Sequence, residues 1–440
     1  MTEFKIIQEL NSVNIQKLID DQKIIGRKNL PDKDIEYWSA IHLRTKEVIE
    51  DNRRGEQSLK MAQLLYLVTE SIHHLKFQPI PKYYTYTEVR LLDWFIGKER
   101  QNYSHYKQRC IIGIYYLLKD FLRFESETLA GIESNNQEHH DNIDINDRIK
   151  KLKAVFNDTK NLFFDVNGST FTDKYVTQRH ATVEGYCNEE SKVSGLIDFT
   201  CFPRTQTHDE YAFLRTIHIA EFCFLGIIIT VKETIDNIKN NFPLKAAKCI
   251  RQSIFFANIL HGVFKVLRTM PSKPINNFEF FRDETGNASA VQSKNYQELD
   301  VYLRGIDVKK KEVYDENEHL KYLQKFAHSS FTYNFKYVLS TLNENDEKWK
   351  EIFTSAREFD KKINTWKGLH LGFAYAYLPP DAMGTGSTSG ASYLERFLKS
   401  SIFDETNFDY DIFKDNFSKE DFPFLHDMLT RVYPSIAIAI

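Results

Sequence analysis

The stretch FDKKINTWKGLHLGFAYAYL, residues 359–378, predicts the fold most directly. Its apolar residues recur at the three- and four-residue spacing that places them on one face of an α-helix. Pro379-Pro380 follows and stops the helix, because proline has no amide hydrogen and its ring clashes with the preceding turn. The sequence GTGSTSG, residues 384–390, then opens a loop of small residues. We therefore expect a long amphipathic helix followed by a glycine-rich loop.

The same helical spacing recurs in most of the chain, whereas few segments alternate as strands do. It is found in Gln57–Leu75, Glu88–Phe124, Glu210–Ile238, Leu244–Met270, Lys321–Leu342 and Glu347–Leu378. The polar, acidic stretch Ser134–Asp147 is expected to be an exposed connection. These patterns predict a mainly α-helical fold.

A chain of 440 residues exceeds one typical hydrophobic core, so more than one domain is expected. We place the boundary after the polar stretch. Residues 1–180 are predicted to be a mostly helical N-terminal region of unknown role, and residues 181–440 a second helical domain.

The composition limits the class of partner. The net charge of −3, with 27% charged and 42% hydrophobic residues, gives no bias towards nucleic acid or an anionic membrane surface. The first residues lack the apolar core of a signal peptide, and the longest apolar run, residues 222–231, is too short to cross a bilayer. We expect a cytoplasmic protein whose partner is a small molecule or another copy of the chain.

Five cysteines are scattered without CxxC or CxxCH spacing, which excludes a zinc knuckle and ordinary c-type haem attachment and fits a reducing compartment. The histidine pairs at residues 73–74 and 139–140 are more typical of solvated side chains than of metal ligands. The tyrosine-rich stretch from residue 83 to residue 116 carries interleaved arginines and lysines, which would suit nucleic-acid stacking. Its apolar spacing favours the buried face of a helix instead.

His370 is the residue of the predicted C-terminal helix with the clearest chemical use. A neutral imidazole on a rigid helix is a suitable axial ligand for haem iron. A single helical histidine is seldom a ligand, so this reading depends on its surroundings. A phosphate-binding loop at residues 384–390 is set aside, because the lysine is missing and a helix rather than a strand precedes it.

The surroundings of His370 resemble a known family. The pattern W-x-x-x-H followed by G-T-G-x-x-S-G-x-x-Y-L is similar to the haem-binding end of tryptophan 2,3-dioxygenases. Its residues here are Trp366, His370, Gly384, Thr385, Gly386, Ser389, Gly390, Tyr393 and Leu394. The resemblance implies that His370 is the proximal iron ligand, that the loop glycines Gly384 and Gly386 border the cofactor, and that Thr385 meets the ammonium and carboxylate of an amino-acid substrate. One residue more than usual separates His370 from the loop.

Two upstream segments extend the resemblance in the same order. HDEYAFLRTIHIAEF, residues 208–222, looks like the first helix of the family's distal pocket, which places Phe213 where an aromatic residue packs on the substrate ring. Residues 270–300 are similar to the family's F-R and S-x-x-Q-S block, which implies that Arg282 grips the substrate carboxylate. A guanidinium suits this task because it makes two parallel charge-assisted hydrogen bonds.

The chain departs from the family at the distal position. Ile217 occupies the place where tryptophan 2,3-dioxygenases carry a histidine, and His218 is its neighbour. Successive helical side chains diverge by about 100°, so His218 should point away if Ile217 faces the iron. The related indoleamine 2,3-dioxygenases also lack this histidine. Ile217 and His218 are therefore the two positions to be tested for a catalytic role.

The resemblance implies a haem-dependent oxygenase that uses haem b and O2 and acts on the ring of an aromatic amino acid. Dioxygenation of the indole C2–C3 bond of tryptophan or a substituted tryptophan is the first expectation. A haem-dependent hydroxylase of tyrosine or tryptophan and a haem protein without catalysis remain alternatives, followed by a helical interaction protein without cofactor. By resemblance a homo-oligomer, dimer or tetramer, is expected. Residues 1–180 would then cover a neighbouring subunit's pocket or form a partner-binding module.

Overall fold

The structure is a computed structural model, and it describes most of the chain. The described residues are 2–51, 55–77, 82–97, 102–134, 141–167, 179–205, 207–272, 277–285, 288, 290–307, 310–325, 333–378, 391–398 and 400–404. Within these ranges all regular structure is helical, and no strand is present. The prediction of a mainly α-helical protein is confirmed.

The chain forms two compact units that interleave along the sequence. Unit 1 comprises Met1–Gly97, Ile112–Ile219 and Thr269–Ala288, and unit 2 comprises Lys98–Ile111, Ala220–Arg268 and Ser289–Ile440. Helices α7 (Tyr103–Ser134) and α11 (His208–Lys239) contribute residues to both units. The boundary expected between residues 180 and 181 stays a prediction.

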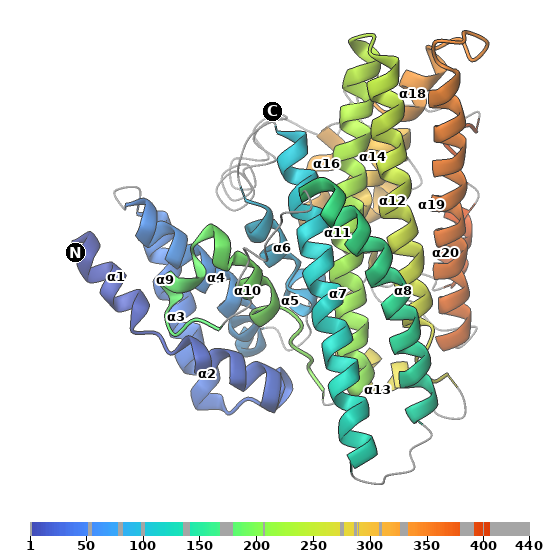
Figure 1. Cartoon of the computed structure of the whole chain (residues 1–440). Helices are drawn as coiled ribbons and strands as arrows, with labels where there is room; N and C mark the ends of the chain where they lie inside the picture. The colour runs from blue at the N-terminus through green and yellow to red at the C-terminus, as the bar shows by residue number, and fades with distance from the viewer. Residues whose placement is uncertain are drawn as a thin grey trace. The chain divides into compact units, whose positions relative to one another are not determined.

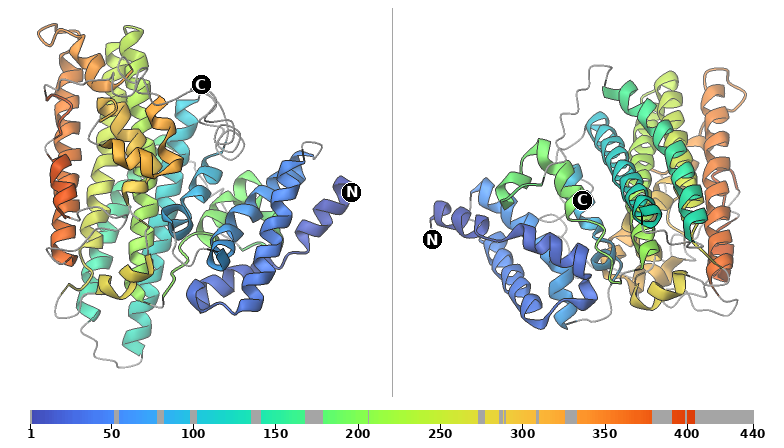
Figure 2. Two further views of the ribbon diagram at one scale, coloured as in Figure 1. Left: turned by 180° about the vertical axis from the view of Figure 1, so that it is seen from behind. Right: turned by 60° about the horizontal axis from the view of Figure 1, so that its bottom comes forward.

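Unit 1 is built around a helical hairpin near the N-terminus. Helices α3 and α4 pack along each other, and α1, α5, α6 and α9 contact α4 (Figure 1). Figure 2 shows the same pairing of the blue helices from two further sides. The helices of this unit outside α7 and α11 are α1 (Glu3–Asn11), α2 (Ile15–Asp20), α3 (Asp32–Glu50), α4 (Glu56–Phe77), α5 (Tyr83–Thr87), α6 (Val89–Ile96), α8 (Asp141–Asn167), α9 (Val183–Tyr186), α10 (Lys192–Asp198) and α13 (Asn277–Thr285).

The hairpin is stable because its apolar positions are removed from water. Trp38 of α3 and Leu64, Leu65 and Val68 of α4 belong to one buried cluster. Burying an aliphatic side chain of this size contributes about 1.5–3 kcal/mol. The cluster continues into α9 and the segment after α10 through Tyr186 and other aromatic residues, so the N-terminal helices share one core with residues 183–202.

Unit 2 is organised by α12 (Pro243–Leu267) and α19 (Lys350–Tyr377), which run side by side (Figure 1). The second half of α11 packs against α12 at Gly226, where the ring of Phe256 lies so close that a β-carbon would be only 2.6 Å away. Among the described residues, the other α-helices of unit 2 are α14 (Lys294–Arg304), α15 (Lys311–Glu316), α16 (Tyr322–Lys325), α18 (Phe335–Ser340) and α20 (Ala391–Leu398).

Three predicted segments differ from the observed helices. Gly97, with a φ of 83°, ends α6 inside the helix expected over residues 88–124, because this conformation is open to glycine and strained for other residues. The helix expected over residues 321–342 is not continuous, because residues 333 and 334 are non-helical and α18 ends at Ser340. The connection expected at residues 134–147 is helical from Asp141 onward, where α8 begins.

By length and composition alone, helix α11 could cross a membrane. The sequence did not lead us to expect this, because its longest apolar run, residues 222–231, is short. Of its most apolar window, 83% is buried inside the protein. This burial is typical of a core helix, which passes the same test.

Candidate functional site

His370 lies in unit 2 near the C-terminal end of α19. The helix predicted at residues 359–378 is present and begins earlier, at Lys350. It ends at Tyr377, just before the two prolines. An imidazole on an uninterrupted helix has a fixed backbone direction, as an axial ligand requires.

Aromatic residues hold the His370 ring. The indole of Trp366, one helical turn earlier, is stacked on it with ring centroids 5.9 Å apart and an angle of 18° between the planes. Phe264 of α12 meets the imidazole edge to face at 5.4 Å. Apolar neighbours on two sides restrict rotation of the imidazole about its side-chain bonds.

The protonation state of His370 suits a metal ligand. Its side chain is half-buried, and burial lowers its pKa from 6.5 to about 4. The imidazole is therefore neutral at pH 7, and neutral imidazole is the form that binds iron. No hydrogen bond to its ring nitrogens occurs within the described part of the chain. No group of three or more metal-ligating side chains occurs there, but haem iron needs only one axial protein ligand, so His370 fits this cofactor.

The loop after α19 cannot be examined in the same way. Gly384, Thr385 and Gly386 fall within residues 379–390, which lie outside the described residues. Their predicted contacts with cofactor and substrate stay predictions.

In unit 1, charged side chains fix the start of α11. His208 Nε2 is 2.9 Å from Glu125 Oε2, and Asp209 pairs with the buried Arg148. Glu210 accepts hydrogen bonds from the backbone amides of residues 204 and 205, both at 2.8 Å. The HDE sequence at residues 208–210 thus has a structural role: it anchors α11 to α7, α8 and the preceding loop.

Phe213 lies next to the helix that carries Arg282. Its ring contacts those of Phe278 and Phe281 on α13, with centroids 5.6 and 5.4 Å apart. Arg282 follows Phe281 directly and is half-buried. Ile217, one turn after Phe213, packs into the same apolar cluster. Unit 1 therefore brings the predicted ring-binding residue together with the helix of the predicted carboxylate-binding residue.

A second contact joins the same two sequence segments in unit 2. Asn295, at the start of α14, donates a hydrogen bond of 2.9 Å from Nδ2 to Glu221 Oε2 on α11. Ser293 caps α14 by accepting from the amide of Tyr296. Residues 208–222 and 270–300, recognised separately in the sequence, thus meet in each unit.

His218 belongs to a different environment from Ile217. It is fully buried, donates from Nε2 to the Thr87 carbonyl at 2.6 Å, and accepts at Nδ1 from Arg215 at 3.4 Å. Burial, and then the charge of Arg215, lower its pKa from 6.5 to about 3. Both ring nitrogens of His218 therefore form hydrogen bonds. The different surroundings of His218 and Ile217 are expected, because neighbouring side chains of a helix diverge. A catalytic role for either Ile217 or His218 stays a prediction.

Sequence reasoning missed the buried ion pair behind this histidine. Arg215 lies 2.6 Å from Asp120 Oδ2 and donates to Thr200 Oγ1 at 2.6 Å. Burial alone would raise the pKa of Asp120, but the charges of Arg215 and Lys23 hold that pKa below its usual range. The available signal was a charged residue inside an apolar helical run, at residue 120 of α7 and residue 215 of α11.

Comparison with known proteins adds one distant similarity. The chain is 23% identical over 239 residues to the tryptophan 2,3-dioxygenase of Shewanella woodyi, and the match covers 46% of this chain and 82% of that protein. No protein-family model matches the chain. The similarity supports, at low identity, a relationship to the family that the sequence motifs resemble.

Proposed function

We propose that this protein is a haem-dependent oxygenase that acts on the ring of an aromatic amino acid, with tryptophan as the first candidate. His370 would hold the iron, and haem would supply the activation of O2 that side chains alone cannot provide. Phe213 would pack on the substrate ring, and Arg282 and Thr385 would take its carboxylate and ammonium.

The neutral His370 ring, held between Trp366 and Phe264, is the observation that carries this proposal. A histidine with these properties is expected at a haem ligand, and among the described residues its ring nitrogens form no hydrogen bond. The distant similarity to a tryptophan 2,3-dioxygenase supports the same cofactor and the same class of substrate.

Ile217 is the reason for keeping a second candidate reaction. Its side chain cannot donate or accept a proton, and it lies in an apolar cluster with Phe213. A substrate ring there would meet an apolar wall, with no hydrogen bond from this position to select an indole nitrogen. Hydroxylation of a tyrosine or tryptophan ring is therefore the second candidate.

The cofactor proposal is tested by an absorption spectrum of the full chain reconstituted with haem. We expect a Soret band with a ferrous spectrum typical of histidine ligation, and loss of that ligation in His370→Ala. The matched control is His261→Ala, which removes a histidine of α12 whose pKa is also lowered by burial. Unchanged ligation in His370→Ala, or equal losses in both variants, would show that His370 is not the ligand.

The reaction is tested by mass spectrometry of products formed from isotopically labelled O2 with tryptophan, tyrosine and ring-substituted analogues. Two labelled oxygen atoms in one product support dioxygenation, and one supports hydroxylation. Spectroscopically intact haem protein that forms no oxygenated product from any of these substrates would favour a non-catalytic haem protein.

A further inference from the structure

Unit 1 contains a cavity that the proposed reaction does not use. Its volume is about 680 Å³, within the range of small-ligand pockets. It lies among α7, the start of α11 and the segments around residues 23–26 and 197–207. Its polar lining includes Lys23, Asp120, Arg123, Arg179, Asp198 and Tyr211.

The cavity borders the side of α11 opposite to the predicted substrate residues. His208 and Tyr211 line it, whereas Phe213 and Ile217 do not. A rotation of about 100° per residue places Ile217 about 180° from His208 around the helix axis. The cavity is therefore a candidate site distinct from the positions of Phe213 and Ile217, and Tyr211 borders both the cavity and the apolar cluster of those two residues.

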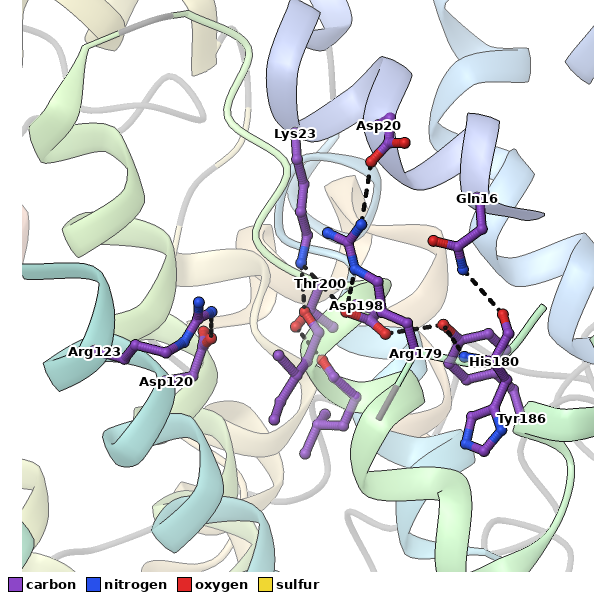
Figure 3. A network of polar contacts seen from close by, with 12 residues as sticks. Gln16, Asp20, Lys23, Asp120, Arg123, Arg179, His180, Tyr186, Asp198 and Thr200 are labelled. Carbon is purple, nitrogen blue, oxygen red and sulfur yellow. Dashed lines mark hydrogen bonds and ion pairs between the residues drawn. The ribbon is translucent and has the colours of Figure 1, made fainter. Parts of the chain in front are cut away.

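Two cations at one end of the cavity share a single carboxylate at long distance, and Lys23 also donates to the Ile197 carbonyl at 2.9 Å. Lys23 Nζ is 3.9 Å and Arg179 Nε is 3.8 Å from Asp198 Oδ1. The other oxygen of Asp198 accepts from the Tyr186 hydroxyl at 2.9 Å. Figure 3 shows Lys23 and Arg179 directed at Asp198 from different segments, and Asp20 as a further partner of Arg179.

The other buried carboxylate of the lining is already neutralised. Asp120 accepts from Arg215, Tyr211 and Arg123, and Arg215 stands outside the lining. The lining holds four cationic side chains and three carboxylates. The cations are Lys23, Lys119, Arg123 and Arg179, and the carboxylates are Asp120, Glu127 and Asp198. With the outside partners Arg215 of Asp120 and Asp20 of Arg179 included, five cations face four carboxylates, and this excess of one positive charge favours an anionic ligand.

An aromatic wall gives the same cavity affinity for a flat ring. Phe124 and Tyr211 are stacked with centroids 3.8 Å apart, and His208 stacks on Phe124 at 4.9 Å. All three residues line the cavity. Stacked side chains form an extended apolar surface on which another aromatic ring can pack.

We propose that this cavity binds a small aromatic carboxylate, with its carboxylate on Lys23 and Arg179 and its ring against Phe124 and Tyr211. Two cations of different segments can hold one carboxylate with charge-assisted hydrogen bonds. The ligand would bridge residues 23 and 179 to α7 and α11, and so it would restrain the back of the helix that carries Phe213 and Ile217.

The test is isothermal titration calorimetry of the full chain with indole-3-acetate as the probe. We expect saturable binding that weakens about tenfold or more in Lys23→Met and in Arg179→Gln, because each loses a charged hydrogen bond. The control Lys46→Gln removes an exposed cation of α3, which pairs with Glu50 at 3.8 Å, and should bind as the parent does. Half of the Arg179 side chain is exposed, so its variant is expected to fold even if Lys23→Met does not.

Three results would overturn the proposal: no saturable binding up to about 1 mM probe, equal affinity for indole without a carboxylate, or equal weakening in Lys46→Gln. The variant His370→Ala separates this site from the proposed haem site. Binding that persists in His370→Ala and is weakened in Arg179→Gln supports the cavity. Binding lost in His370→Ala and unchanged in Arg179→Gln would place the probe at the haem site instead, whatever the reaction catalysed there.

Discussion

The imidazole of His370 lies nearly parallel to the indole of Trp366, four residues earlier on α19, with an angle of 18° between the ring planes. This spacing places both side chains on one side of the helix. The stack fixes the imidazole plane, and with it the direction in which a ring nitrogen can meet a metal. Trp366 is therefore expected to matter for stability and for the geometry of ligation.

Replacing Trp366 should destabilise the protein in proportion to the volume removed. The indole is 3% exposed and packs against Phe224, Phe264 and Tyr296. We expect Trp366→Ala to lower the free energy of unfolding by about 3–5 kcal/mol. Trp366→Phe should cost less, since it keeps most of the packing and removes an indole N–H that has no hydrogen-bond partner among the residues the structure describes. Urea unfolding measures both, and similar losses in the two variants would contradict this account.

Helix α19, which carries Trp366 and His370, was predictable from the sequence, whereas the aromatic residues that pack on this pair were not. Periodic apolar residues and the proline pair located α19 to within one residue at its end, because local sequence decides where a helix stops. Phe264 and Phe224 come from helices more than a hundred residues away in sequence. No spacing rule connects them to His370, so only the folded chain shows the aromatic surroundings.

The buried His218 should make stability depend on pH. Its pKa is about 3 in the folded protein against 6.5 for an unperturbed histidine, so the unfolded chain binds more protons between these values. The stabilisation is fully present above pH 6.5 and is lost as the pH falls towards 3, by at most about 1.4 kcal/mol per pH unit for one proton. Urea unfolding from pH 7.5 to pH 4.5 measures this dependence.

His218→Gln provides the comparison for that series. A glutamine amide can still donate to the Thr87 carbonyl but does not titrate, so the slope below pH 6.5 should become shallower than in the parent. The remaining slope has other sources, such as His42, whose pKa burial and His73 also lower to about 3. An unchanged slope in His218→Gln would mean that His218 is not the titrating group.

The pair of Arg215 and Asp120 should behave as one unit. Both side chains are at most 2% exposed, so removing one leaves the other charge buried without its main partner. We expect Arg215→Met and Asp120→Asn each to cost about 3–5 kcal/mol in unfolding free energy. The double variant should cost clearly less than the sum of the two. Additive losses in a double-mutant cycle would show that the two residues do not depend on each other.

The ion pair of Arg215 and Asp120 was only indirectly visible in the sequence. Asp120 and Arg215 interrupt apolar helical runs, which indicates that a buried charge needs a partner, but the partner's identity depends on how α7 and α11 pack. The predicted substrate residues illustrate the opposite case. Phe213 and Arg282 were recognised through motifs, and the structure then placed the Phe213 ring against the helix of Arg282 through Phe281.

Arg282 gives the most direct prediction about the substrate. If its guanidinium holds the carboxylate, Arg282→Ala should weaken binding of L-tryptophan by about 1.5–3 kcal/mol, the cost of a lost charged hydrogen bond. Arg282→Lys should restore only part of the affinity, because an ammonium cannot make the two parallel hydrogen bonds of a guanidinium. Spectral titration of the haem-loaded protein measures these affinities.

Tryptamine, which has no carboxylate, should bind the parent and Arg282→Ala equally. Lys28→Ala serves as the matched cation control, since Lys28 pairs with Glu284 on the same helix α13. Equal weakening of tryptophan and tryptamine would assign Arg282 a structural role rather than a role in binding the carboxylate.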